Sequence, residues 1–276
     1  MAKTPRLMPT NPRLFRAQVV RSVRLTPSMH RVTVTGLDLH EFDHLGYDHW
    51  FRLFVQLPHQ DAFELPELDG AKWWPPFLAI PEAVRPHCAN YTVAAHRQDV
   101  GELDIDFVVH TGADGAPEGR AAIWACAAQP GDELAVLDQG RIFDCPPDAS
   151  EVLVVAEETG LPGVVGIAAS LPRDTVGRII QEVPTAADVR DLDAPAGVTV
   201  TWVVREHEDP SAVPGTAALE ELRRHTLSDD RGYAFVVGES TLATEGRRHL
   251  HRAGLPKSRI TFSGFWKHEA KIRVDA

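Results

Sequence analysis

Apolar and polar residues alternate in several short stretches across the first half of the chain, a pattern typical of half-buried β-strands. Gly, Pro and Asp residues break these stretches, and the region carries little helical periodicity. Strands are therefore predicted at residues 15–26, 30–39, 49–58, 91–96, 102–110 and 132–140. This series of short strands predicts an antiparallel barrel. Residues 59–84, rich in Pro and Trp and without a clear period, are expected to form an insertion or flap.

The pattern changes near Asp148, after which apolar strand-like runs alternate with helix-like runs. Strands are predicted at residues 151–156, 176–183, 197–206 and 233–240. Helical runs are predicted up to residue 172, and at residues 215–227 and 241–254. Alternating strands and helices predict a three-layer α/β domain with a parallel sheet. The chain is therefore expected to contain two domains, at residues 12–148 and 149–276.

Composition narrows the classes of protein that this chain can represent. With 276 residues, 43% hydrophobic and 24% charged, the chain can build two modest packed domains. Its net charge of −11 argues against a nucleic-acid binder, and an anionic ligand would need a local basic pocket. The N-terminal stretch lacks a signal-peptide core, and no apolar window has the length of a membrane helix. A cytoplasmic protein without membrane insertion is expected.

Several familiar site chemistries have no support in the sequence. The three cysteines show no C-x-x-C spacing, so neither a disulfide framework nor a zinc site is indicated. His249 and His251 would lie on different faces of a helix, and no metal site is predicted. The chain has no G-x-S-x-G, H-E-x-x-H or G-K-[ST] motif. No catalytic acid, base or nucleophile is therefore assigned.

Seven segments spread along the chain resemble, in order, segments of the siderophore-interacting proteins. They are "NYTV" (90–93), "FVVH" (107–110), "AAIWACAAQPGDEL" (121–134), "VLVVAEETGLPG" (152–163), "TWVVRE" (201–206), "FVVGES" (235–240) and "GFWKHE" (264–269). The resemblance covers roughly residues 12–268. It implies a ferredoxin-reductase-like fold, in which a six-stranded antiparallel Greek-key barrel binds FAD at residues 12–148. A three-layer α/β domain at residues 149–276 would bind NADPH or NADH.

The resemblance implies a flavin site on the barrel. In the family an R-x-Y-T signature on a barrel strand places the Tyr ring on the isoalloxazine and uses the Thr and nearby backbone to bind the flavin. The matching residues are Asn90, Tyr91, Thr92 and Val93. His110, at the end of "FVVH", corresponds to a residue that abuts the flavin in the family.

The residues that would hold the flavin phosphates depart from the family pattern. Ala89 and Ala94 stand where arginines are usual, and Ala122 stands where the helix that receives the pyrophosphate often carries a hydroxyl. Trp124 fits the pattern, and Arg120 is near enough in sequence to supply a substitute charge. Loss of a charge-assisted contact costs about 1.5–3 kcal/mol, or one to two decades in affinity. We therefore expect weaker FAD binding than the family norm.

A nucleotide-binding turn is expected where the first strand of the second domain ends, because buried strands in such domains lead into ligand-binding turns. The resemblance assigns this turn to Glu158, Thr159, Gly160 and Leu161. Thr159 is suited to cap the helix that follows. A second strand ends nearby at Gly238, Glu239 and Ser240, which help close the nucleotide site in the family. The choice between NADH and NADPH stays open.

Substrate recognition would require positive charge, because ferric siderophores are commonly anionic. The basic residues that match the family are Arg52, Arg141 and Lys267, and the neighbouring Trp266 resembles an aromatic residue that packs near the flavin. The resemblance implies an NAD(P)H oxidoreductase in which hydride passes to the flavin and single electrons then reduce siderophore-bound Fe(III). Two alternatives stay open: a protein that binds a siderophore or another small molecule without flavin chemistry, or a flavoenzyme acting on a biosynthetic intermediate. The oligomeric state is not predicted.

Overall fold

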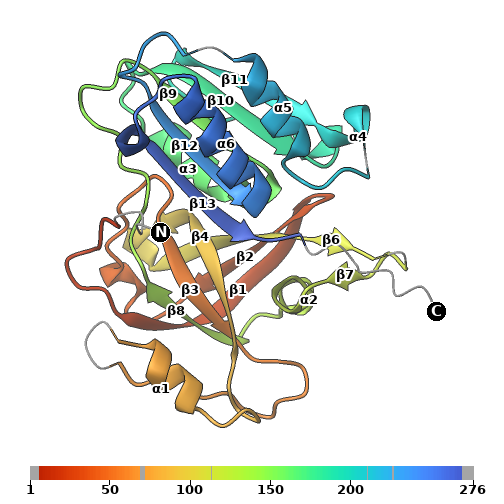
Figure 1. The fold of residues 1–276 in the computed structure, drawn as a ribbon. Helices are drawn as coiled ribbons and strands as arrows, with labels where there is room; N and C mark the ends of the chain where they lie inside the picture. Colours follow the sequence, from red (N-terminus) through yellow and green to blue (C-terminus); the bar gives the residue numbers. More distant parts are fainter. Residues whose placement is uncertain (1–5, 69–71, 113, 210, 226, 269–276) are drawn as a thin grey trace. The chain divides into compact units, whose positions relative to one another are not determined.

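The computed structural model describes residues 6–68, 72–112, 114–209, 211–225 and 227–268. The chain divides into two compact units, shown in Figure 1. One unit, here called the barrel unit, contains the described residues within 6–142 and 165–170. The other, here called the α/β unit, contains the described residues within 143–164 and 171–268. This division does not test which cofactor each unit binds. The predicted domains at 12–148 and 149–276 therefore stay a prediction. Residues 269–276 lie outside the described residues.

Six antiparallel strands close the predicted barrel in the order β1-β2-β5-β4-β3-β8. β2 pairs with β5 rather than with β3, which gives the sheet its Greek-key connection. The predicted barrel is thus confirmed, with strand ends that differ by a few residues. The strands are β1 (Leu14–Thr26), β2 (Met29–Thr35), β3 (Trp50–Val55), β4 (His87–Arg97), β5 (Glu102–Val108) and β8 (Glu133–Asp138).

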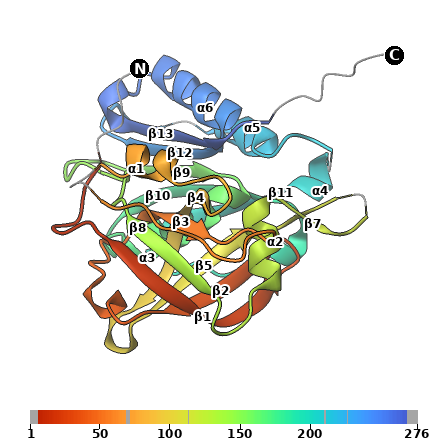
Figure 2. The ribbon, with the colours of Figure 1, turned by 90° about the horizontal axis from the view of Figure 1, so that it is seen from below.

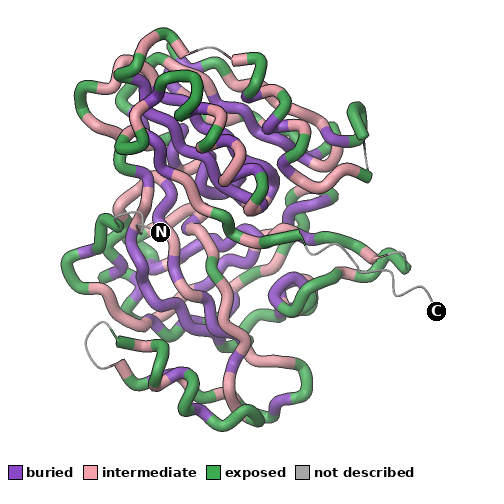
Figure 3. Tube along the Cα trace, in the orientation of Figure 1, coloured by how far each residue is buried: buried purple, intermediate pink, exposed green. Residues whose placement is uncertain are grey.

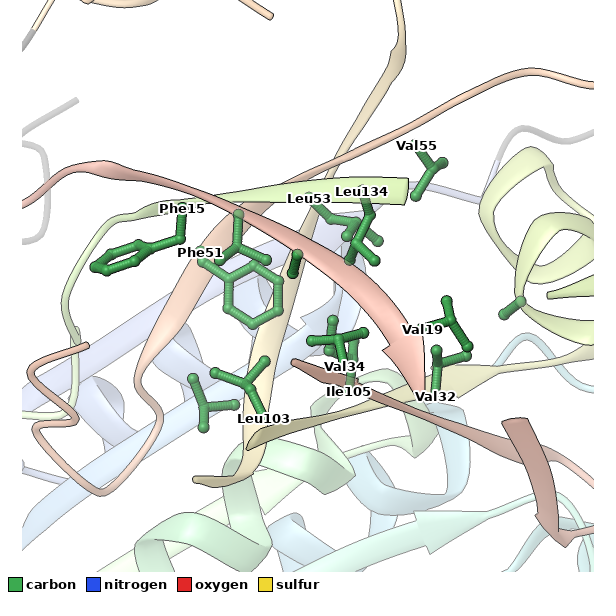
Figure 4. Close-up of a cluster of buried hydrophobic side chains, with 14 of the residues drawn as sticks. Phe15, Val19, Val32, Val34, Phe51, Leu53, Val55, Leu103, Ile105 and Leu134 are labelled. Atoms are coloured by element: carbon green, nitrogen blue, oxygen red, sulfur yellow. The ribbon is translucent and has the colours of Figure 1, made fainter. Parts of the chain in front are cut away.

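Alternation along the barrel strands builds the core of this unit. Phe51, Leu53 and Val55 alternate along β3, and all are almost completely buried. Figure 4 shows them together with inward side chains of β1, β2, β5 and β8. Because successive side chains of a strand point to opposite faces, the residues between them face outward. This parity decides which residues of β4 face the same side as Tyr91.

The remaining elements of the barrel unit are short. They are η1 (Leu39–Glu41), α1 (Trp74–Ala79), η2 (Gln98–Val100), β6 (His110–Thr111), β7 (Pro117–Glu118) and α2 (Arg120–Ala127). The helix α1 lies within the predicted insertion at 59–84, of which residues 69–71 are outside the described part. β6 and β7 form a small antiparallel hairpin just before α2. The insertion therefore contains one element that its sequence did not predict.

A parallel sheet of five strands, in the order β11-β10-β9-β12-β13, forms the centre of the α/β unit. Every residue of β9 and β12 is buried, as Figure 3 shows. The four predicted strands are present, and β13 is an addition. The strands are β9 (Val152–Ala156), β10 (Val176–Val183), β11 (Gly197–Val204), β12 (Tyr233–Glu239) and β13 (Ile260–Trp266).

The connections of this sheet reverse direction next to β9. From β9 the chain runs outward to β10 and β11, then returns to β12 on the other side of β9 and continues to β13. Right-handed crossovers place α5 and α6 on the face opposite the crossover that begins with α3. Figure 2 shows α6 beside β12 and β13. The ends of β9 and β12 therefore flank a topological switch point, where α/β folds bind ligands.

Seven helices follow β9 in the described residues; three of them match the predicted helical runs, and four, each of three or four residues, were not predicted. They are η3 (Glu158–Gly160), α3 (Leu161–Ser170), η4 (Ala186–Asp188), α4 (Arg205–Glu208), α5 (Thr216–Arg224), α6 (Ser240–Arg252) and η5 (Lys257–Arg259). Among the described residues, no helix combines the length and apolar character that crossing a membrane requires.

Candidate functional site

An aromatic cluster lies where the predicted flavin signature meets the barrel core. The rings of Tyr91 on β4 and Phe107 on β5 have their centroids 4.5 Å apart. The ring centroid of Trp124, on α2, lies 6.0 Å from that of Phe107. Burial raises the pKa of Tyr91 well above its usual range. Tyr91 and Trp124, predicted from separate motifs, are thus brought together through Phe107.

The other residues of the "NYTV" segment divide between the two faces of β4. Val93 is buried in the barrel core, and its backbone N–H donates to the His49 carbonyl at 2.8 Å. Asn90 is exposed on the opposite face, where its side-chain oxygen accepts a hydrogen bond from Arg52. Thr92 lies beside Trp50 in the register of β3 and β4. The side chains of Asn90 and Thr92 therefore leave β4 on the face opposite Tyr91.

Ala89 shares the Tyr91 face of β4, as does His87 two residues earlier. Arg120 is the first residue of α2 and is exposed, whereas Ala122 is buried in the same helix. Arg120 lies close enough to His87 to lower the pKa of its imidazole, after the larger effect of burial. Arg120 therefore brings positive charge from α2 to this end of β4.

A pocket of about 290 Å³ opens beside His87 and Arg120 in the barrel unit. An aromatic surface and a cavity lined by cationic side chains are features that suit a dinucleotide flavin. The residues present therefore fit this cofactor. His110 lies farther along the chain on β6, exposed and opposite Glu118 of β7.

Glu157 follows β9 at the switch point and is completely buried. Its carboxyl group accepts from the Thr159 backbone N–H at 2.8 Å, from the Thr159 hydroxyl, and from Trp266 Nε1 at 3.0 Å. Burial, followed by the charge of Glu158, raises the pKa of Glu157 to about 8. Glu157 caps the turn by accepting from the Thr159 backbone N–H, and the Thr159 hydroxyl donates back to Glu157, although we expected Thr159 to cap the helix that follows.

Glu158 lies inside the α/β unit, where Arg205 neutralises it. Arg205 Nη2 and Nη1 donate to the two Glu158 oxygens at 2.6 and 3.0 Å. The same guanidinium binds Glu182 at 2.6 Å, and all three residues are buried. Glu182 also accepts from the backbone N–H groups of Gly215 and Ala218. The "EET" turn therefore does not present two negative charges to a nucleotide at neutral pH.

Two glycines make the close approach of β9 and β12 possible. Gly238 has φ +126°, and a Cβ atom there would lie 2.6 Å from Glu157 Oε1. A Cβ atom on Gly160 would lie 2.7 Å from the Cβ of Ala156. Small residues at such turns let a ligand approach the backbone. Leu161, predicted as part of this turn, is buried at the start of α3.

Hydrogen bonds join the end of β12 and the residue that follows it to the end of β13. The Ser240 hydroxyl donates to the Trp266 carbonyl at 2.7 Å. Glu239 is buried and accepts from the backbone N–H groups of Thr241 and His268. The predicted residues Gly238, Glu239, Ser240 and Trp266 are thus neighbours of Glu157 at the switch point. They meet there because parallel strands end at one edge of the sheet.

The three basic residues predicted to bind the substrate belong to different units of the chain. Arg52 extends from β3 between two indole rings, 5.2 Å from the Trp50 centroid and 5.0 Å from that of Trp73. Arg141 lies 4.2 Å from the ring centroid of Tyr47. Both belong to the barrel unit, whereas Lys267 is exposed just after β13 of the α/β unit.

Sequence reasoning missed Arg6, His87 and Arg205. Arg6 lies 4.9 Å from the Trp50 ring centroid, close to Arg52, and no motif marked it. Arg205 is the second-last residue of the quoted "TWVVRE" segment and directly follows β11, so a cation at the end of a predicted strand was the available signal. His87 precedes the flavin signature on the same strand, and its parity with Tyr91 could have marked it.

Two family models together match most of the chain. The siderophore-interacting FAD-binding domain matches residues 18–141, and the siderophore-interacting protein model matches residues 149–269. The ferric vibriobactin reductase ViuB of Vibrio cholerae is 28% identical over 258 residues, covering 93% of this chain and 89% of that protein. The NADPH-dependent ferric-chelate reductase of Escherichia coli strain K12 is 25% identical over 254 residues, covering 90% and 91%. The crystal structure of a siderophore utilization protein from T. fusca has a TM-score of 0.80 at 28% identity, covering 96% and 97%.

The barrel, the parallel α/β unit and these matches define a flavoprotein with the ferredoxin-reductase-like fold, as predicted. The chain belongs to the siderophore-interacting protein family.

Proposed function

We infer that this chain is a flavin-dependent NAD(P)H oxidoreductase that reduces iron(III) held by a siderophore. One observation carries this conclusion: the family's FAD-binding domain matches residues 18–141, where the structure forms a closed barrel with an aromatic cluster at the flavin signature. The relatives named ferric vibriobactin reductase and ferric-chelate reductase support the same activity. When bound, FAD would accept hydride from the nicotinamide and pass electrons singly to the iron.

The barrel unit would hold the flavin. Tyr91, supported by Phe107 and Trp124, offers a rigid aromatic edge for the isoalloxazine, and stacked rings add about 0.5–1.5 kcal/mol beyond area burial. Arg120 would supply positive charge for the phosphates in place of the side chains that Ala89 and Ala122 lack. These assignments, with those of Asn90, Thr92, Val93 and His110, are proposals.

The α/β unit would bind the nicotinamide nucleotide at the switch point. Gly160 and Gly238 would allow the nucleotide to approach the backbone, and the buried network around Glu157 would keep the strand ends rigid. Glu158 would act by holding the turn through Arg205 rather than by contacting the nucleotide. The remaining assignments at Thr159, Leu161, Glu239, Ser240 and Trp266 rest on the same neighbourhood.

The substrate would be an anionic ferric siderophore, for which we propose Arg52, Arg141 and Lys267 as binding residues. The guanidinium of Arg52 is held between Trp50 and Trp73, so little side-chain freedom would be lost when it binds oxygen anions. The proposed location is the cytoplasm, where reduced nicotinamide nucleotides are supplied. Which siderophore is used is a question for substrate screening.

A steady-state assay tests this function. The purified protein, FAD and NADPH or NADH are mixed with a panel of ferric siderophores, and ferrous iron is trapped with a coloured chelator. Iron(II) formation that requires both FAD and the nucleotide is expected. A protein that binds FAD but reduces no ferric chelate with either nucleotide would overturn the assignment.

A second candidate is a binding protein without flavin chemistry, which the alanines at positions 89, 94 and 122 favour. It predicts tight siderophore binding without any binding of FAD. Calorimetric titration with FAD and with ferric siderophores separates the two functions.

A further inference from the structure

Residues 6–8, which precede β1, form a short segment here called the strap. Leu7 forms an isolated antiparallel bridge with Arg141. The Leu7 backbone N–H donates to the Arg141 carbonyl at 2.9 Å, and the Arg141 N–H donates to the Leu7 carbonyl at 3.0 Å. Gly140 permits this approach, because a Cβ atom there would lie 2.0 Å from the Leu7 carbonyl oxygen. The strap is therefore fixed to the residues that follow β8.

The strap brings Arg6 over the indole ring of Trp50. The guanidinium carbon of Arg6 lies 4.9 Å from the ring centroid, and its Nη1 donates to Gln139 Oε1 at 3.1 Å. Gln139 is buried, and its amide nitrogen donates to the Asp138 carbonyl at 2.7 Å, so this acceptor is itself held in place. Arg6 is exposed, yet a ring contact and a hydrogen bond fix where its charge lies.

Trp50 carries a second guanidinium, that of Arg52. The Arg52 guanidinium carbon lies 5.2 Å from the Trp50 centroid and 5.0 Å from that of Trp73. Burial lowers the pKa of Arg52, and the charge of Arg6 lowers it further. Within the described part of the chain, neither arginine has a carboxylate partner. Two like charges thus share one ring without an anion, and an anionic ligand would relieve their repulsion.

This cluster has more hydrogen-bond donors than acceptors. Trp50 Nε1 and Arg52 Nε are buried and have no acceptor among the described residues, an uncommon state for polar atoms in folded proteins. Arg6 uses Nη1 in its hydrogen bond to Gln139, which leaves Nε and Nη2 for another acceptor. A planar guanidinium is suited to the paired oxygens of an anion. The unused donors and the uncompensated charge therefore point to an oxygen-rich anionic ligand.

We propose that Arg6, placed by the strap, binds the ferric siderophore together with Arg52, and that this pair selects ferric complexes of net negative charge over neutral ones. The inference rests on the proposed function and deepens it. Arg6 lies before residues 18–141, which match the FAD-binding family model, so the family match does not assign it. Coulomb attraction scales with the charge of the ligand, so a triply anionic ferric tris-catecholate gains from Arg6 and a neutral ferric trihydroxamate does not.

The experiment compares these two ferric complexes as substrates of the full chain with FAD and a nicotinamide nucleotide. Arg6→Gln should raise KM for the ferric tris-catecholate by about three- to tenfold, the size expected for one partly screened charge. KM for the ferric trihydroxamate, KM for the nucleotide and kcat should stay unchanged. Arg21→Gln, at an exposed position on β1, is the matched control and should change none of these values.

A second variant tests the strap without removing a charge. Leu7→Pro lacks the N–H that donates to the Arg141 carbonyl, so it should release the strap while Arg6 stays in the chain. We expect L7P to raise KM for the ferric tris-catecholate as much as R6Q does. The double variant R6Q/L7P should show no further rise, because both changes remove the same contact. Urea unfolding of each variant checks that the barrel remains folded.

Three results would contradict these expectations. An unchanged KM for the ferric tris-catecholate in R6Q would overturn this inference and leave the proposed function standing. Equal rises in KM for the anionic and the neutral complex in R6Q would overturn the selection by charge. Calorimetric titration of both complexes measures binding without turnover. It therefore tests Arg6 even if the unmodified protein reduces no ferric complex, a result that would overturn the proposed function.

Discussion

Trp266 Nε1 donates to Glu157 Oε1 at 3.0 Å, joining the last residue of β13 to the residue that follows β9. β12 lies between these two strands, so the hydrogen bond passes the end of β12 at Gly238. Only a residue without a Cβ atom leaves room there, because that atom would lie 2.6 Å from the same carboxyl oxygen. Glycine at position 238 therefore leaves the space that the hydrogen bond between Trp266 and Glu157 requires.

Replacing Gly238 by alanine should disturb this edge of the sheet. We expect G238A to lower the free energy of unfolding by about 1–3 kcal/mol and to weaken NAD(P)H binding, with FAD affinity retained. Urea unfolding and nucleotide titration measure the two effects. Gly254→Ala is the matched control, since Gly254 also has a positive φ (+109°) but no atom within 4 Å of its added Cβ. Equal losses of stability and of NAD(P)H affinity in G238A and G254A would show that steric conflict with Glu157 plays no part.

Glu157 should make the stability of the protein depend on pH. Burial, and then the charge of Glu158, raise its pKa from 4.5 to about 8. The folded state therefore holds the proton more tightly than the unfolded state, so this stabilisation is complete below pH 4.5 and is lost as pH rises through 8. Glu157→Gln carries no such proton. The stability of E157Q relative to the unmodified protein should increase steadily between these limits.

Urea unfolding at a series of pH values checks this prediction. Glu245→Gln, on α6, serves as the control at a less buried glutamate, whose pair with Arg248 is an exposed i,i+3 contact. Parallel stability curves for E157Q and the unmodified protein would show that Glu157 is ionised in the folded state at neutral pH.

Removal of Arg205 should be costly because two buried carboxylates share its guanidinium. R205A leaves Glu158 and Glu182 without a cation and is expected to destabilise the α/β unit by about 3–5 kcal/mol. R205K keeps the charge but loses the planar fork, so an intermediate loss is expected. In the double variant E158Q/R205A, one uncompensated charge is gone and part of the stability should return. A loss below about 1 kcal/mol for R205A, the size of a surface pair, would contradict this prediction.

Patterns within single segments predicted most of the fold. The alternation along 15–26 and the buried runs at 151–156 and 233–240 each specify a strand without reference to the rest of the chain. β13 was not predicted as a strand, because its exposed half, Gly264–Trp266, has no alternation and its buried half is short. Its place in the sheet comes from pairing with β12.

The site was predicted as separate residues rather than as an arrangement. Tyr91 and Trp124 belong to different motifs, and their common contact with Phe107 arises only when β4, β5 and α2 pack together. Arg205 could equally have been a surface charge, since a cation after a strand is usually solvated. Its role depends on two carboxylates, 47 and 23 residues away in sequence, that share one buried space.

Substrate affinity should depend on Arg52. Arg52→Ala removes a guanidinium held between Trp50 and Trp73 and should raise KM for a ferric siderophore by about tenfold or more, the loss of one charge-assisted contact. KM for the nicotinamide nucleotide should stay unchanged. Arg21→Ala, at an exposed position on β1, is the control. Equal KM values for R52A and R21A would remove Arg52 from the proposed substrate site.

Anaerobic spectroscopy of the protein loaded with FAD tests the proposed reaction most directly. Added NADPH or NADH should bleach the visible absorption band of the flavin, and a ferric siderophore added afterwards should restore it while a chelator traps iron(II). Bleaching without recovery on addition of any ferric siderophore would contradict ferric-siderophore reduction. A band that neither nucleotide bleaches would contradict NAD(P)H as the electron donor.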